Sequence, residues 1–115
     1  MANTFKVVTK AGVTSSDVIY TVAGSTTTVV LGVMVGNTTT GQITATVTLS
    51  SDTSSRAGAN NEAHQDVELV TNAPIPVVGT LELLSGNKVV METTDVLKLA
   101  ASGAADICVS IMEIT

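Results

Sequence analysis

Apolar and polar residues alternate with a period of two along most of this chain of 115 residues. Residues 42–49 read QITATVTL, so one face of the segment is apolar and the opposite face carries three threonines. The apolar side chains are Ile43, Ala45, Val47 and Leu49. A strand with a single apolar face belongs to an antiparallel sheet, because parallel strands are usually buried on both faces.

Short segments of this kind recur, separated by turn residues about every ten positions. They are residues 5–9, 18–22, 28–35, 42–49, 67–70, 81–84, 88–91, 96–100 and 107–114. No window has the 3.6-residue period of a helix. The sequence therefore predicts an all-β fold, a single-domain antiparallel β-sandwich over residues 1–115 of jelly-roll or Greek-key type.

Apolar residues within these segments are expected to form the core. They are Val30, Leu31, Val33, Ile43, Val47, Leu49, Leu83, Leu97, Val109 and Ile111. Gly32 interrupts the most hydrophobic segment, which predicts a β-bulge or the close approach of another backbone. Residues 73–76 read APIP and predict an extended, non-helical stretch.

Charged residues make up only 13% of the chain, and the net charge is −5. Ordinary domains carry about twice this fraction. A domain of this mass exposes roughly 5,800 Å², so each charge is spread over roughly 400 Å². We expect the surface to be covered with hydroxyls or buried against other subunits. The expected assembly is a closed homo-oligomer, with a trimer as first choice, or ordered attachment to a larger shell that is only weakly sensitive to salt.

Several classes of protein do not fit this composition. The five Lys and Arg residues are scattered and the only aromatic residues are Phe5 and Tyr20, so nucleic-acid binding is not expected. No run of eighteen apolar residues suggests a membrane span, and the first residues do not resemble a signal peptide. Cys108 is the only cysteine, so no intrachain disulfide can form, and we expect a small buried side chain there.

Candidate catalytic and metal-binding groups are few. His64 is the only histidine, and Glu62, His64 and Asp66 could form a metal site at alternate positions of one segment. A solvated loop is the favoured interpretation, because ordering three ligands on one loop costs entropy. For Glu92 and Asp95 we favour turn formation over paired carboxylates. We therefore predict no catalytic, cofactor-binding or metal-binding residue, and no enzymatic activity.

Residues 50–66 lack periodicity and predict the longest loop. Loops of this length are usually functional or disordered. Arg56 offers a forked hydrogen-bond donor, and Glu62, His64 and Asp66 offer charge in a chain that carries little of it, so these four are the candidate interface residues. The alternative is a surface loop without contacts. A variant in which a short glycine turn replaces the loop distinguishes the two alternatives. If this variant folds and binds its partner with unchanged affinity, the loop makes no functional contact.

Three segments resemble small virion structural proteins of tailed bacteriophages. They are VIYTVAGSTTTVVLGVMVGN, NAPIPVVGTLELLSGNKVVMETTDVLKLAAS and the closing DICVSIMEI, which together cover most of residues 18–114. Thr94 departs from the family pattern, which has glycine before the aspartate of that turn, and residues 50–66 form a longer loop than is usual.

The resemblance implies a component of the virion, assembled in the host cytoplasm. The expected role is a decoration or cement protein that binds the outside of the head, with the major capsid protein as partner. A tail, neck or fibre-associated module is the alternative, and a receptor- or glycan-binding module is a weaker one. No cofactor, nucleic acid or membrane is expected as a partner.

Overall fold

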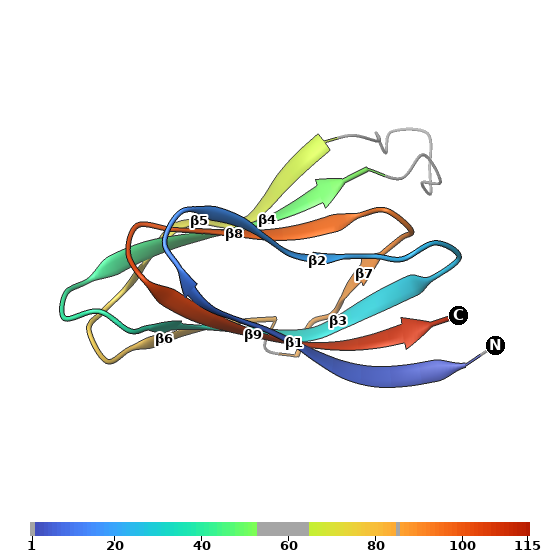
Figure 1. Ribbon diagram of the computed structural model, residues 1–115, viewed down its shortest axis with the longest axis horizontal. Coiled ribbons are helices and arrows are strands. Elements are labelled where there is room, and N and C mark those ends of the chain that lie inside the picture. Colours follow the sequence, from blue (N-terminus) through green and yellow to red (C-terminus); the bar gives the residue numbers. More distant parts are fainter. Residues whose placement is uncertain (1, 53–64, 85) are drawn as a thin grey trace.

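Two antiparallel β-sheets pack face to face in the structure, a computed structural model that describes residues 2–52, 65–84 and 86–115 (Figure 1). The five-stranded sheet has the order β1-β9-β3-β6, and β7 also pairs with β3. Its strands are β1 (Asn3–Val13), β9 (Ala105–Ile114), β3 (Thr27–Asn37), β6 (Thr80–Leu83) and β7 (Val89–Met91). The four-stranded sheet consists of β2 (Ser16–Thr21), β8 (Val96–Ala101), β4 (Ile43–Ser51) and β5 (Gln65–Ile75), in that order.

Successive strands mostly lie in opposite sheets, since only the β4–β5 and β6–β7 connections stay within one. This arrangement confirms the predicted all-β sandwich and is compatible with a jelly-roll or Greek-key topology. Among the described residues there is no helix that could cross a membrane.

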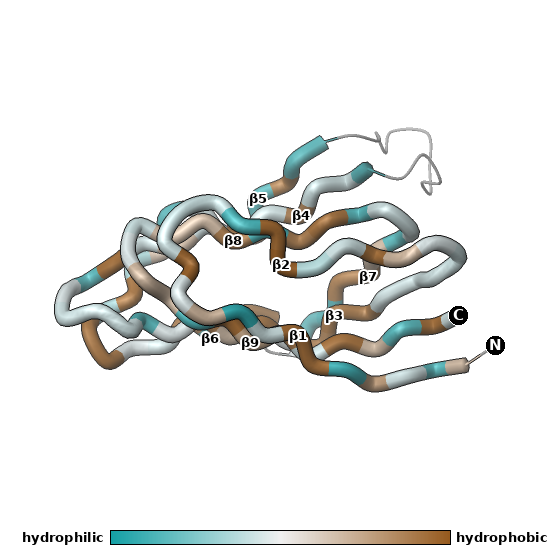
Figure 2. The backbone as a smooth tube through the Cα atoms, in the orientation of Figure 1, coloured by the Kyte–Doolittle hydropathy of each residue, from teal (hydrophilic) through white to brown (hydrophobic). Residues whose placement is uncertain are grey.

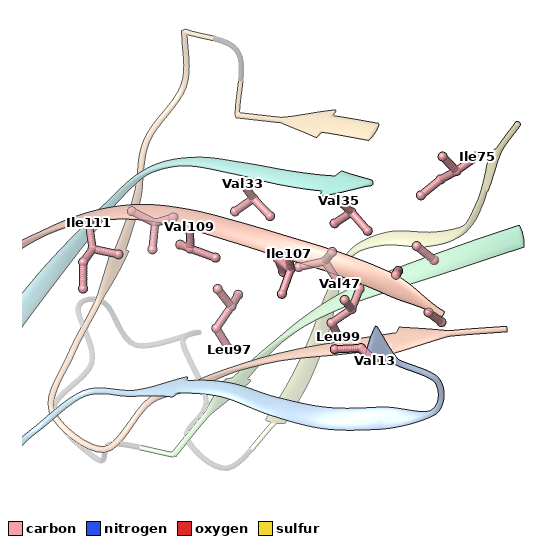
Figure 3. Packing of buried hydrophobic residues seen from close by; sticks show 14 of the residues in the cluster. Val13, Val33, Val35, Val47, Ile75, Leu97, Leu99, Ile107, Val109 and Ile111 are labelled. Carbon is pink, nitrogen blue, oxygen red and sulfur yellow. The ribbon is translucent and has the colours of Figure 1, made fainter. Parts of the chain in front are cut away.

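The core lies between the sheets and consists mainly of valine, leucine and isoleucine from alternate strand positions (Figure 3). Seven of the ten expected core residues are buried: Val30, Val33, Ile43, Val47, Leu97, Val109 and Ile111. The prediction was wrong in part for Leu31, Leu49 and Leu83, which are half-buried. Leu49 and Leu83 pack against the edge of the core, whereas Leu31 does not.

The position of Leu31 follows from a β-bulge in β3. The register with β9 shifts between Val30 and Gly32, so the buried positions change phase from Thr28 and Val30 to Val33 and Val35. Leu31 is the extra residue and leaves the inward-facing set. The register shift confirms the predicted bulge, whereas a Cβ on Gly32 would meet nothing within 4 Å, so no other backbone in the described part of this chain approaches it closely.

Strand ends differ from the sequence prediction where a bulge lets a strand continue past a turn residue. β1 runs through Gly12, which adopts φ +68°, and the ladder with β9 shifts between Lys10 and Val13. The gap between the predicted segments 5–9 and 18–22 is thus reduced to a short link between Val13 and Ser16.

The chain at residues 73–76 is extended, as predicted. Pro74 lies within β5, which pairs only with β4 and so forms a sheet edge. This placement suits proline because an edge strand needs no backbone N–H on its open side.

Candidate functional site

The structure leaves most of the predicted interface untested. Arg56, Glu62 and His64 lie outside the described residues. Asp66 is exposed in β5 and lies opposite Ser50 of β4. The predicted bounds of the loop, residues 50–66, are therefore wrong at both ends, because these residues belong to strands. Within the described ranges, no group of three or more His, Cys, Asp or Glu side chains could hold a metal ion.

Asp95 anchors the turn between β7 and β8. Its fully buried carboxylate accepts hydrogen bonds from the backbone N–H of Glu92 (2.9 Å) and of Asp52 (3.0 Å). The first bond is the turn formation predicted for this pair. The second ties the turn to the end of β4, so Asp95 has a structural role. Thr94 keeps this turn by adopting φ +73°, a conformation that favours glycine.

The outer faces of the two sheets differ in chemistry. On the four-stranded sheet, the outer face of β4 carries Thr44, Thr46 and Thr48. Thr46 lies opposite Ala100 of β8, and Thr48 lies opposite Lys98. The Thr46 hydroxyl accepts a hydrogen bond of 2.9 Å from the backbone N–H of Asn72. This face is therefore rich in hydroxyls, as the threonine alternation predicted.

The outer face of the five-stranded sheet instead carries a row of apolar side chains. Register places Phe5 opposite Met112, Met112 opposite Val29, and Val29 opposite Val90, so four apolar side chains form a row across β1, β9, β3 and β7. Phe5 is 72% exposed and Val90 is 55% exposed. Figure 2 shows hydrophobic residues recurring along the strands of this sheet, including those that face the core. We call the outward-pointing side of this sheet the apolar face.

Two hollows flank Met34 on the apolar face. Gly32 and Gly36 precede and follow Met34 at the outward positions of β3, and the missing side chains leave space there. One hollow, of about 450 Å³, is lined by Gly32, Leu84 and Ser110, among others. The second, of about 400 Å³, lies beside Gly36 and Thr80. Met34 lines both and is itself exposed.

Cys108 also lines both hollows, because it lies opposite Met34 on the apolar face. It is half-buried, so the expectation of a buried side chain was wrong in part. The cause is its phase in β9, where Ile107 and Val109 point into the core and Cys108 points outward.

A second apolar feature is the turn between β5 and β6. The backbone N–H of Gly79 donates to the carbonyl of Pro76 (2.9 Å), which closes a turn with Val77 and Val78 at its tip. Val78 has φ +65° and is 91% exposed. A β-branched residue in this conformation is strained, and glycine or asparagine is the usual choice there.

Asn37 holds this turn firmly against the end of β3. Its buried side-chain amide donates to the carbonyls of Ile75 (3.0 Å), Pro76 (3.2 Å) and Gly41 (2.8 Å). Its backbone N–H donates to the carbonyl of Gly79 (3.0 Å). The strained valine therefore stands on a turn that is fixed at several backbone positions.

Charged and hydroxyl groups join the sheets at the other end of the sandwich. The Tyr20 hydroxyl lies 2.7 Å from the Thr28 hydroxyl and donates to the Glu113 carboxylate at 2.5 Å. Lys6 forms an ion pair with the same carboxylate at 2.7 Å. Burial, followed by the bond to Glu113, raises the pKa of Tyr20 to about 12. The bonds from Lys6 and then from Tyr20 lower the pKa of Glu113.

Sequence reasoning missed both apolar features, although signals for them were present. Residues 28–35 read TVVLGVMV, which is apolar on both faces and so predicts an outward apolar side as well. Val77 and Val78 stand between proline and glycine, where a turn is expected and exposed valines are unusual.

Comparison with known proteins adds little. No protein-family model matches the chain, and no curated protein sequence matches it. A solved structure of pili, from work reporting that Bacillus endospore appendages form a novel family of disulfide-linked pili, is similar over 96% of this chain and 85% of its own. The two share 14% identity with a TM-score of 0.43, so the similarity assigns neither a family nor a function.

Proposed function

We propose that this chain is a bacteriophage virion structural protein that decorates the outside of the head shell and acts by binding, without catalysis. The resemblance of residues 18–114 to small virion proteins supports this role, together with the sparse charge of the surface. The observation that carries the proposal is the exposed, strained Val78 at the tip of a firmly held turn.

Strain of this kind persists only where the surrounding structure imposes it, and it is frequent at binding sites. Val78 leaves solvent only if it meets an apolar partner, and the Asn37 bonds fix the turn before that contact forms. A fixed turn loses little conformational entropy on binding, which favours attachment to a repeating surface. Because the tip is apolar, attachment is expected to depend weakly on salt.

Mass spectrometry of purified particles tests the proposed location. We expect the chain in particles of the phage that encodes it, at hundreds of copies when it covers the head. A much smaller copy number would favour the tail, neck or fibre module. Absence from the particles would overturn the virion role.

Val78→Gly tests the proposed contact. The substitution removes the apolar tip and relieves the strain, so the protein should be at least as stable as the wild type while its attachment to particles weakens. Thr94→Gly is the matched control, because it relieves strain at another β-branched residue with positive φ, away from this turn. Equal attachment of both variants and the wild type would refute a role for Val78.

A further inference from the structure

We propose that the apolar face pairs with the same face of a second copy of this chain, across a two-fold axis parallel to the strands and between β9 and β3. The inference rests on the register of the five-stranded sheet and needs only the isolated protein. Its failure would therefore leave the proposed virion role untouched.

The size of the face fits a stable pair. Strands β1, β3 and β9 have 11, 11 and 10 residues, and β6 and β7, which share the fourth position, have 4 and 3. With a rise of about 3.3 Å per residue and a strand spacing of about 4.8 Å, they cover about 600 Å². Two such faces bury about 1,200 Å², the lower limit of a specific protein interface. Aligned packing of sheets at about 30° is also the usual geometry of a β-sandwich.

The apolar row is complementary to itself under this axis. Rotation places β1 of one copy over β7 of the other, and β9 over β3. Phe5 then faces Val90, and Met112 faces Val29, so each larger side chain meets a smaller one. An axis perpendicular to the strands through this row would instead set Phe5 against Phe5.

The next row matches a protruding side chain to a hollow. Val7 is exposed on β1 and is in register with Ser110 and Gly32. The rotation places Val7 over the β6–β7 side of that row, where the hollow beside Gly32 and Leu84 opens. A valine from the second copy would therefore fill space that this chain leaves empty.

Charge is also compatible with the pair. Glu82 is in register with Met34, Cys108 and Thr9, so under the proposed axis it faces the Thr9 hydroxyl of the second copy. Asp106, a second outward carboxylate, accepts a hydrogen bond from the backbone N–H of Gly12 at 2.9 Å. No like charges meet along these rows.

A two-fold pair differs from the trimer expected from the sequence. An isologous contact uses the same patch on both copies and closes after two, whereas a trimer requires two different patches. The match between rows therefore selects a dimer.

Sedimentation velocity over a concentration series tests the pairing. The wild type should form a dimer, and Val90→Glu should raise its dissociation constant at least about tenfold, because a charge is buried without a partner. Val18→Glu is the matched control: Val18 is 53% exposed on the other sheet, opposite Lys98. Circular dichroism establishes that both variants are folded. A monomeric or trimeric wild type, or equal dimers from both variants, would overturn the proposal.

Crosslinking tests the direction of the axis. In a Cys108→Ser background, a mixture of Phe5→Cys and Val90→Cys chains should form a disulfide-linked dimer faster than either chain alone. Faster linking of Phe5→Cys chains to each other would place the axis perpendicular to the strands and would refute the geometry.

Discussion

The Tyr20 hydroxyl in β2 donates a 2.5 Å hydrogen bond to the Glu113 carboxylate in β9, so one contact joins the two sheets of the sandwich. The same carboxylate binds Lys6 of β1. Three strands thus meet at a single side chain in β9.

Tyr20→Phe should lower the free energy of unfolding by about 1.5 kcal/mol near neutral pH, because a hydrogen bond to a charged group is lost. The raised pKa of Tyr20 adds a pH signature. The protonated Tyr20 hydroxyl stabilises the folded state fully below pH 10.0, which is the ordinary tyrosine pKa. This stabilisation is lost as the pH rises toward the folded-state pKa of about 12. Urea unfolding should therefore show the difference between wild type and variant shrinking through that window. A constant difference would contradict this coupling.

Glu113→Gln should change how the free energy of unfolding depends on pH below neutrality. Because the folded-state pKa of Glu113 is lowered, mainly by Lys6, its stabilising effect is present above the ordinary carboxylate pKa and is lost as the pH falls through the folded value. The variant should be less stable than the wild type at neutral pH, and the two should converge in acid. Urea titrations at several acidic pH values measure this convergence.

Alternation was sufficient to predict the sandwich, because a period of two identifies strands wherever one face is buried. It failed at bulges. Leu31 is the extra residue of the bulge in β3 and so leaves the inward-facing set, and Gly12, with positive φ, lets β1 continue past residue 9, where the predicted segment ended. Bulges depend on the partner strand, so a single strand's pattern does not reveal them.

The candidate surfaces were harder to predict for a related reason. Which residues form a row across four strands depends on strand order, and Phe5, Met112 and Val90 are far apart in the sequence. The strain at Val78 is likewise invisible in the sequence, because it depends on the conformation that the Asn37 bonds impose on the turn.

Leu97→Ala and Leu31→Ala compare the loss of stability at a core position with the loss at the bulge position. Leu97 is 1% exposed, so its truncation should cost about 2–5 kcal/mol through lost burial and a new cavity. Leu31 is half-buried and lies outside the core cluster, so Leu31→Ala should lower the free energy of unfolding by less than about 1 kcal/mol. Thermal unfolding of both variants measures the difference, and equal losses would show that the bulge has been misplaced.

Asp95→Ala should be among the most damaging polar substitutions. It leaves the N–H groups of Glu92 and Asp52 without their carboxylate acceptor at a fully buried position, which should cost about 2–4 kcal/mol. Asp95→Asn keeps one carbonyl acceptor and should recover part of the loss. Chemical denaturation of both variants provides the comparison, and equal losses would mean that the carboxylate bonds contribute little.

Thr94→Gly should stabilise the protein although it removes a side chain. Thr94 holds φ +73°, and a non-glycine residue in this region costs about 1–2 kcal/mol. Glycine relieves that strain but gives the unfolded chain more freedom, which offsets about 0.4–1 kcal/mol. A net gain of about 0.5–1 kcal/mol is therefore expected, because the backbone bonds of the turn, from Thr94 to Val22 and from Asp95 to Glu92, are retained. Thr94→Asn should give a smaller gain, since asparagine tolerates this conformation. A loss of stability in both variants, measured by thermal unfolding, would show that the threonine side chain contributes more than its strain costs.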